Sequence, residues 1–132
     1  MSSFKWSDCP VIIPYYGGKY QLSKVLVPMI PEHKRYIEVF AGGLSMYFRK
    51  VNAEFSVVND FDNDIANLYH VICEDFDAFK KYCRMIPKSR HLFYNFRLEL
   101  NDKHIGKFPD YNRAAKYYYM IMNAFNNNYF CP

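Results

Sequence analysis

The segment that most constrains the fold places short apolar runs on either side of a glycine turn. Residues 36–40 predict a short buried strand, Ala41-Gly42-Gly43 interrupts it, and residues 45–50 have the character of a helix. Residues 55–58 predict a second strand, which ends at Asn59-Asp60. A strand, a glycine turn, a helix and a second strand in this order indicate a βαβ unit with a parallel strand pair. The sequence therefore predicts an α/β fold.

Helical periodicity dominates the rest of the chain. Residues 11–19 predict an extended run into a glycine turn, and a short helix ending at Pro28 and Pro31 follows. Its apolar positions are Leu22, Val25, Leu26 and Met29. Beyond the second strand, four more apolar patterns predict helices: Ile65, Leu68, Tyr69 and Ile72; Phe76, Phe79, Cys83 and Ile86; Phe93, Phe96 and Leu100; Ala114, Tyr118, Ile121 and Phe125. We expect Asp110 or Asn112 to cap the last helix.

Charge is uneven along the chain. Its 132 residues are enough for one small domain, and the formal net charge is +4. Acidic side chains outnumber basic ones in residues 1–77, whereas residues 78–132 are strongly basic. A basic half favours an anionic partner, nucleic acid first, although an ordinary solvated helix surface has the same composition. We therefore expect a core over residues 1–77 and a basic helical region over residues 78–132.

Several classes of protein are excluded by simple patterns. No apolar run approaches the roughly 18 residues that a membrane-spanning helix needs, so no membrane association is expected. The cysteines, Cys9, Cys73, Cys83 and Cys131, form no CxxC pair, which predicts neither a zinc site nor a disulfide framework. No metal site is expected. Buried or idle thiols in a reducing cytoplasm are the simplest interpretation, and we expect a cytoplasmic protein.

Three local features point to nucleotide chemistry. The glycines of Tyr15-Tyr16-Gly17-Gly18-Lys19 allow close backbone approach to a ligand, and the lysine can meet a carboxylate or phosphate. A glycine-rich turn after a strand, here residues 38–43, is where α/β folds bind nucleotides. Asp60 follows about 20 residues later, where an acid can accept hydrogen bonds from ribose hydroxyls. A helix cap or turn role for Asp60 is the alternative.

Taken together, these features resemble the DNA adenine methylase family, the S-adenosylmethionine-dependent enzymes that methylate the amino group of adenine. The matching stretches are Tyr15-Tyr16-Gly17-Gly18-Lys19, then Tyr36-Ile37-Glu38-Val39-Phe40-Ala41-Gly42-Gly43-Leu44-Ser45, then Asn59-Asp60 with Asn67-Leu68-Tyr69. Residues 114–119 with Phe125-Asn126 match more faintly. The resemblance spans residues 11–130 and implies a partial Rossmann-like methyltransferase core followed by a helical region.

The resemblance implies a role for each matching residue. S-adenosylmethionine is the implied cofactor, and its implied site consists of Tyr15, Gly17, Lys19, Glu38, Phe40, Ala41, Gly42, Gly43, Asp60 and Phe61. Within that set, Asp60 would hold the ribose and Phe61 would flank the adenine ring. The basic helices would belong to the DNA-recognition region, with Lys80, Lys81, Arg84, Lys88, Arg90 and Arg97 as candidate phosphate contacts.

The sequence also departs from the family pattern. The family's catalytic Asp-Pro-Pro-Tyr motif, which holds the flipped adenine, is absent from residues 1–132, so no catalytic residue is assigned. Val39 stands where the family usually has proline, and Phe130 where a basic residue is expected. Leu44 stands where the family usually has the last glycine of the loop, and its side chain disfavours a positive φ. Leu44 is therefore the position that opposes cofactor binding.

Two interpretations of function stay open. The chain corresponds either to the front half of an adenine methylase, inactive alone, or to a methylase-derived pseudoenzyme that binds a partner protein or DNA. A phage or mobile-element factor acting on host defence is one example of the second class. Two parallel strands alone leave open sheet edges, which favours a homo-oligomer or a second protein chain as cover. The aromatic content of 20% fits either an aromatic core or rings that a partner covers.

Overall fold

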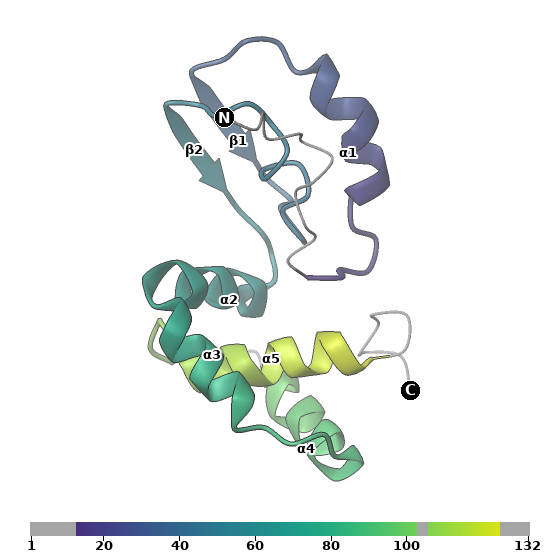
Figure 1. Cartoon of the computed structure of the whole chain (residues 1–132), viewed down its shortest axis with the longest axis vertical. Coiled ribbons are helices and arrows are strands. Elements are labelled where there is room, and N and C mark those ends of the chain that lie inside the picture. Colours follow the sequence, from purple (N-terminus) through teal and green to yellow (C-terminus); the bar gives the residue numbers. More distant parts are fainter. Residues whose placement is uncertain (1–12, 103–105, 125–132) are drawn as a thin grey trace, which may run out of the picture. The chain divides into compact units, whose positions relative to one another are not determined.

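The computed structural model describes residues 13–102 and 106–124 and divides the chain into two compact units. The first unit ends at Asp60 and the second begins at Phe61 (Figure 1). The residues noted above at positions 9, 11, 12, 125, 126, 130 and 131 lie outside the described residues. The expected division after residue 77, which separates cofactor binding from DNA recognition, stays a prediction about function.

In the first unit, a parallel strand pair follows a short helix. Helix α1 (Tyr20–Leu26) continues into the 3-10 helix η2 (Val27–Met29), and strands β1 (Arg35–Glu38) and β2 (Phe55–Val58) follow. The strands pair in parallel, with Arg35 opposite Phe55 and Glu38 opposite Val58. Pro28 lies in the first turn of η2, where a missing N–H costs no helical hydrogen bond. The predicted α/β class and its two parallel strands are confirmed.

The helix expected over residues 45–50 does not form, and that expectation was wrong. The segment consists of turns, in which the N–H of Phe48 donates to the carbonyl of Leu44 and the N–H of Lys50 donates to that of Met46. It starts at Leu44, whose φ of 55° is left-handed and cannot begin a regular helix. A segment this short also gains too few hydrogen bonds to offset the cost of helix nucleation.

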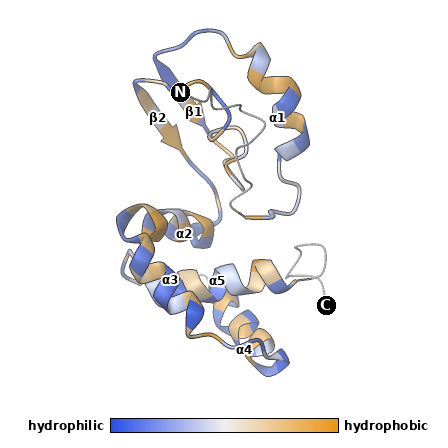
Figure 2. Ribbon diagram, viewed as in Figure 1, coloured by the Kyte–Doolittle hydropathy of each residue, from blue (hydrophilic) through white to orange (hydrophobic). Residues whose placement is uncertain are grey.

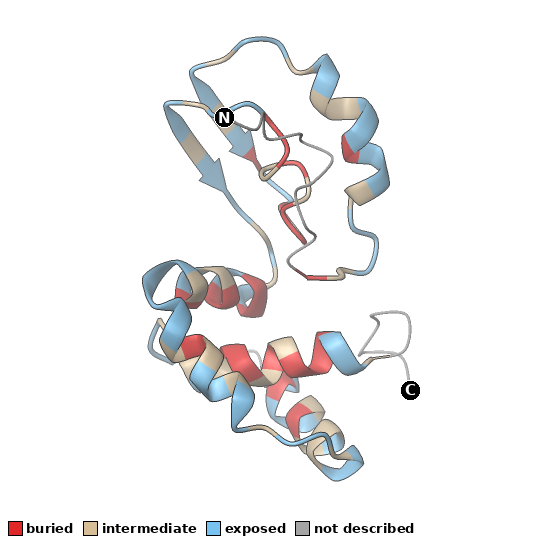
Figure 3. Ribbon diagram, viewed as in Figure 1, coloured by how far each residue is buried: buried red, intermediate tan, exposed pale blue. Residues whose placement is uncertain are grey.

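One face of the strand pair is apolar and exposed. Paired positions of parallel strands point to the same side, so Ile37, Phe55 and Val57 share a face with Arg35, and we call these three apolar residues the apolar sheet face. Their exposed fractions are 68%, 60% and 39%. Figure 2 shows β2 as hydrophobic, and Figure 3 shows the same strand as largely exposed. This composition is typical of strands that are buried on both faces in a complete α/β sheet.

The second unit is a bundle of helices α2 (Asn63–Glu74), α3 (Phe76–Arg84), α4 (Arg90–Asn101) and α5 (Tyr111–Asn123). Helix α5 contacts the other three. Its core consists of Ile65, Leu68, Val71, Phe79, Phe96, Leu100, Ala114, Ala115, Tyr117, Tyr119, Met120 and Ile121. Each helix begins at a capping side chain, namely Asp62, Asp75, Ser89 and Asp110 in chain order. The predicted cap at Asp110 is confirmed, and none of the described helices is long and apolar enough to cross a bilayer.

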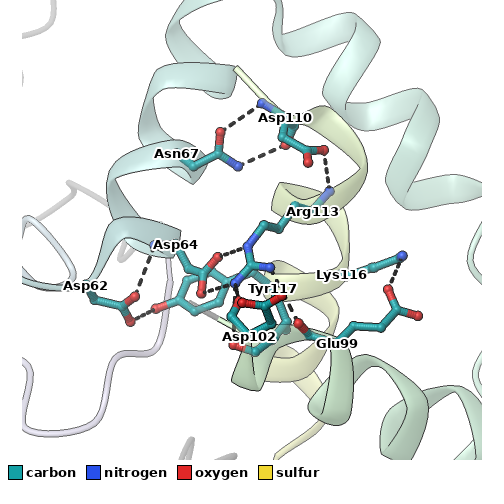
Figure 4. A network of polar contacts seen from close by, with 10 residues as sticks. Asp62, Asp64, Asn67, Glu99, Asp102, Asp110, Arg113, Lys116 and Tyr117 are labelled. Carbon is teal, nitrogen blue, oxygen red and sulfur yellow. Dashed lines mark hydrogen bonds and ion pairs between the residues drawn. The ribbon is translucent and has the colours of Figure 1, made fainter. Parts of the chain in front are cut away.

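Polar contacts hold α2 against the start of α5 (Figure 4). The side-chain amide of Asn67 donates to the carbonyl of Asp110 and accepts from its N–H, both at 2.9 Å. The Tyr117 hydroxyl donates to the Asp62 carboxylate at 2.9 Å. Arg113 forms an ion pair with Asp64, whose side chain is 1% exposed. The two helices are therefore fixed by matched polar groups as well as by apolar packing.

Candidate functional site

The end of β1 carries a buried carboxylate that is held from two sides. Glu38 is 6% exposed, and its Oε1 lies 2.9 Å from Nζ of Lys19. The Tyr36 hydroxyl donates to Oε2 at 3.0 Å. The Lys19 ammonium also donates to the carbonyl of Phe40. Lys19, which directly precedes α1, thus links the glycine turn of residues 15–19 to the end of β1.

Burial shifts the pKa values of two groups near Glu38. Burial, together with the charge of Glu38 and the hydrogen bond to it, raises the pKa of Tyr36 above its ordinary range. Lys50 is 3% exposed, with Nζ 4.6 Å from the centroid of the Tyr36 ring and 5.0 Å from that of Tyr47. Burial lowers the pKa of Lys50, while the negative charge of Glu38 acts in the opposite direction. Cations and aromatic rings therefore surround a single buried carboxylate.

The glycines of the loop after β1 pack against Tyr15. A Cβ atom on Gly42 would lie 3.2 Å from the Tyr15 ring, and one on Gly43 would lie 3.2 Å from the Tyr15 Cβ. Gly42 has a φ of +50°, which favours glycine. The N–H of Gly18 donates to the carbonyl of Tyr15 at 2.9 Å, which closes the first glycine turn. The two glycine motifs of the sequence therefore lie against one another through a single aromatic side chain.

Asp60 holds the same loop from the end of β2. Its Oδ2 accepts a hydrogen bond from the N–H of Gly42 at 2.7 Å. Asn59 adds a second link, because its side-chain amide donates to the carbonyl of Val39 at 3.0 Å. The backbone continues the strand pairing, with the N–H of Ala41 donating to the carbonyl of Asn59 at 2.9 Å. The acid and the glycine loop that the sequence placed about 20 residues apart are in direct contact.

Leu44 has the left-handed backbone conformation that favours glycine, the residue that the family usually has at this position. Its φ is 55° and its side chain is 3% exposed. A left-handed φ costs a leucine about 1–2 kcal/mol, so packing of the buried side chain must hold this conformation. The Leu44 side chain therefore fills interior space in the first unit, and the loop keeps its left-handed turn without the last glycine.

The arrangement has groups that suit S-adenosylmethionine. The Asp60 carboxylate can accept more than one hydrogen bond, so ribose hydroxyls can share it with Gly42. The Glu38 carboxylate suits an ammonium group, although Lys19 already meets it. Phe40 is 74% exposed, and Phe61, the first residue of the second unit, is 95% exposed. The residues fit the cofactor at the ribose side, whereas Lys19 competes for Glu38 at the methionine side.

Contacts or turns in the structure account for most of the predicted site residues. Tyr15, Lys19, Glu38, Phe40, Ala41, Gly42, Gly43 and Asp60 are connected through the contacts described above, and Gly17 forms the left-handed turn before Lys19 with a φ of +69°. Sequence reasoning missed Tyr36, Lys50 and Asn59. Tyr36 could have been found from the strand pattern. Positions two apart on a strand share a face, so Tyr36 points the same way as Glu38. Nothing local in the sequence marked Lys50.

The candidate DNA contacts lie on two helices and the segment between them. Lys80, Lys81 and Arg84 lie on α3, Lys88 precedes α4, and Arg90 and Arg97 lie on α4. All are exposed or partly exposed, and Lys80 forms an exposed ion pair with Asp77 at 2.7 Å.

Within the described residues, no group of His, Cys, Asp and Glu side chains is arranged to hold a metal ion.

The chain is similar to known proteins over most of its length. A family model described as D12 class N6 adenine-specific DNA methyltransferase matches residues 15–130. The chain is 27% identical over 116 residues to the type II methyltransferase M1.LlaDCHI of Lactococcus lactis subsp. cremoris, covering 86% of this chain and 40% of that protein. It is 25% identical over 120 residues to the DNA adenine methylase of Escherichia coli (strain K12), covering 86% of this chain and 41% of that protein.

A phage protein is also similar. The DNA N-6-adenine-methyltransferase of Escherichia phage P1 is 23% identical over 125 residues, which cover 95% of this chain and 15% of the phage protein. The chain thus spans about two fifths of the length of the first two relatives and a smaller part of the phage protein. In all three comparisons the match extends over most of this chain.

Proposed function

The chain belongs to the D12 class N6 adenine-specific DNA methyltransferase family, and from that premise we propose that it provides an S-adenosylmethionine site and part of a DNA-contacting surface. The single observation that carries the proposal is the hydrogen bond from the Gly42 N–H to the Asp60 carboxylate. It joins a glycine loop after one parallel strand to an acid after the next, which is the arrangement that α/β folds use for nucleotides.

The residues of this chain would bind and orient the cofactor. Asp60 accepts hydrogen bonds from ribose hydroxyls, and Gly42 and Gly43 bring backbone close to the ligand. Glu38 attracts the amino group of the methionine portion. When bound, S-adenosylmethionine supplies a methyl group activated by its sulfonium sulfur. Residues 1–132 contain no Asp-Pro-Pro-Tyr sequence to hold a flipped adenine, so we propose that these residues alone do not transfer the methyl group.

Isothermal titration calorimetry with S-adenosylmethionine tests the cofactor proposal. We expect micromolar binding by the full chain and at least a tenfold loss in Asp60→Asn, because the amide removes the negative charge and one acceptor oxygen. Asp77→Asn on α3 is the matched control, since it changes an exposed aspartate of the second unit. Absence of binding at millimolar S-adenosylmethionine, with a folded far-ultraviolet circular dichroism spectrum, would refute the proposal.

A second candidate function is that of a pseudoenzyme that binds DNA or a protein without the cofactor. Two observations favour it: Leu44 replaces a loop glycine, and Lys19 meets both Glu38 and the Phe40 carbonyl. Similarity to a phage protein is compatible with a phage or mobile-element origin. The calorimetric experiment separates the candidates, because a pseudoenzyme of this kind would leave the heat of S-adenosylmethionine dilution unchanged.

DNA binding through the basic helices belongs to the first candidate and to the DNA-binding form of the second. We expect Lys80→Ala/Lys81→Ala/Arg84→Ala to weaken binding to duplex DNA. The slope of log K against log salt should become shallower by up to about 0.9 for each phosphate that the variant no longer neutralises. The control variant Lys24→Ala/Lys34→Ala/Arg35→Ala removes the same charge from exposed positions of the first unit. Equal slopes for the two triple variants would argue against phosphate binding by α3.

We also propose that a second polypeptide, another copy or a different protein, covers the apolar sheet face. Two strands with exposed Ile37, Phe55 and Val57 are an incomplete sheet, and such strands bind further strands or apolar surfaces. Sedimentation velocity over a hundredfold concentration range should show association that Val57→Lys abolishes and the control Val25→Lys on α1 does not. A chain that stays monomeric at the highest concentration, alone and with other methyltransferase fragments, would contradict this.

A further inference from the structure

A cavity in the first unit contains a buried arginine and none of the residues of the candidate cofactor site. Its volume is about 550 Å³, within the range of small-molecule sites. Its polar groups come from Tyr20, Ser23, Lys24 and Arg49, and Val27, Ile30 and Val51 are among its apolar lining residues. Ser23 is fully buried and Arg49 is 6% exposed, so the polar side of the cavity is part of the interior.

Among the described residues, the groups that accept hydrogen bonds from Arg49 all meet one nitrogen of its guanidinium. Its Nη1 donates to the carbonyl of Tyr20 at 2.7 Å and to Oγ of Ser23 at 2.6 Å. Its Cζ lies 3.8 Å from the centroid of the Tyr20 ring, which is a close cation–π contact. The ring, the hydroxyl and the carbonyl therefore fix the orientation of the guanidinium.

The opposite edge of the guanidinium carries N–H groups that donate to no acceptor among the described residues. Among the described residues, no carboxylate forms an ion pair with Arg49, and neither Nε nor Nη2 donates to a protein acceptor. Nε and Nη2 form the side of a guanidinium that meets both oxygens of a carboxylate at once. Arg49 is 6% exposed and has no counter-charge among the described residues, so an anion at this edge would be favoured.

We propose that this cavity binds a small molecule that has one carboxylate and an apolar body. The carboxylate meets the Nε and Nη2 edge of Arg49, and the apolar body lies against Val27, Ile30 and Val51. A second cation strengthens the preference for an anion, because Nζ of Lys24 lies 5.3 Å from the centroid of the same Tyr20 ring. A planar carboxylate suits this fork better than an ammonium or a neutral alcohol would.

Titration of the full chain with hexanoate, followed by ¹H–¹⁵N nuclear magnetic resonance, tests the proposal. We expect saturable shifts at Ser23 and Ile30 with a dissociation constant of about 1 mM, a reasonable affinity for so small a ligand. Hexylamine, which has the same apolar body and the opposite charge, should not produce these shifts. Absence of saturation, or equal shifts with hexylamine, would overturn the carboxylate assignment.

Two variants and their controls locate the site. Arg49→Lys keeps the charge but loses the planar fork, so hexanoate should bind at least about tenfold more weakly. Ile30→Trp fills the cavity and should abolish binding, which decides the question if Arg49→Lys does not fold. Arg35→Lys, the same change at an exposed position of β1, should leave hexanoate binding unchanged. Unaltered binding in both Arg49→Lys and Ile30→Trp would overturn the proposal.

Discussion

At the scale of single residues, Leu44 shows how one side chain can serve two opposed requirements. The loop needs a left-handed residue at this position, and the interior of the first unit receives the leucine side chain. The backbone conformation favours glycine, whereas burial favours leucine. Replacement by alanine and by glycine separates the two effects, because both remove the side chain and only glycine relieves the backbone.

We expect both Leu44→Ala and Leu44→Gly to destabilise the protein, by about 2–5 kcal/mol for the alanine variant through removal of a buried apolar side chain. Leu44→Gly should be less destabilised than Leu44→Ala by about 1 kcal/mol, because glycine accepts a positive φ without steric cost. Urea unfolding monitored by circular dichroism measures both. A glycine variant less stable than the alanine variant would show that the backbone is not strained at this position.

Cys83 on α3 gives a pH-dependent prediction at the same scale. Burial raises the pKa of its thiol from 9.0 to about 11. Between these values the unfolded chain has released the proton and the folded chain has kept it, so stability falls as pH rises through this window. Under reducing conditions, the free energy of unfolding of the wild-type protein should fall more steeply from pH 9 to 11 than that of Cys83→Ala. Parallel curves would mean that the folded environment does not retain the proton.

At the scale of secondary-structure elements, polar side chains join α2 to α5. Asp64 and Arg113 come from different helices, with side chains only 1% and 13% exposed. Arg113 also donates to the carbonyl of Asp102 at 2.8 Å, which brings the end of α4 into the same network. Burial lowers the pKa of Arg113, but the hydrogen bond and charge of Asp64 more than offset it, so the pKa is raised.

Removal of one partner should therefore be costly. We expect Asp64→Leu to destabilise the protein by about 3–5 kcal/mol, because it leaves the buried guanidinium without a counter-charge. The double variant Asp64→Leu/Arg113→Met should lose less than the sum of the two single variants, because it leaves neither charge unpaired. Urea unfolding of the four proteins gives the coupling energy. Additive losses would mean that the two side chains do not stabilise each other. As a control, Asp77→Ala at the exposed pair with Lys80 should change the free energy of unfolding little.

At the scale of the whole molecule, the two units differ in the size of their cores. Among the described residues, the buried apolar side chains of the first unit are Ile13, Ala41, Leu44 and Met46. The second unit buries a larger and more continuous set from all four of its helices. Since apolar burial provides most of the stabilisation, the helical unit should be the more stable of the two.

A fragment of residues 61–132 should fold on its own. We expect a helical circular dichroism spectrum and a single cooperative urea transition, because α5 contacts the other three helices of the unit. The fragment of residues 1–60 should unfold at lower urea concentration or lack a cooperative transition. The opposite ranking of the two fragments would show that the first unit is the source of stability.

Local patterns predicted most of the elements. The residues of β2 were predicted as observed, and Asp110 was one of the two residues predicted to cap the last helix, because strand patterns and capping are short-range effects. The predicted helix over residues 45–50 was wrong because its start depends on the left-handed Leu44, which has no signature in a hydrophobic pattern. The family pattern marked Leu44 as a departure, but only the structure shows its positive φ.

The sequence by itself determined the α/β order, the family to which the chain belongs, and the glycine and acid residues of the candidate site. Spacing along the chain carries that information, because strand ends and glycine turns are local. Only the tertiary structure decided that Lys19, Tyr36 and Lys50 surround Glu38 and that Asp60 binds Gly42. It also decided that Arg49 lines a cavity and has no carboxylate partner among the described residues. These contacts join residues distant in sequence, so packing of the elements determines them.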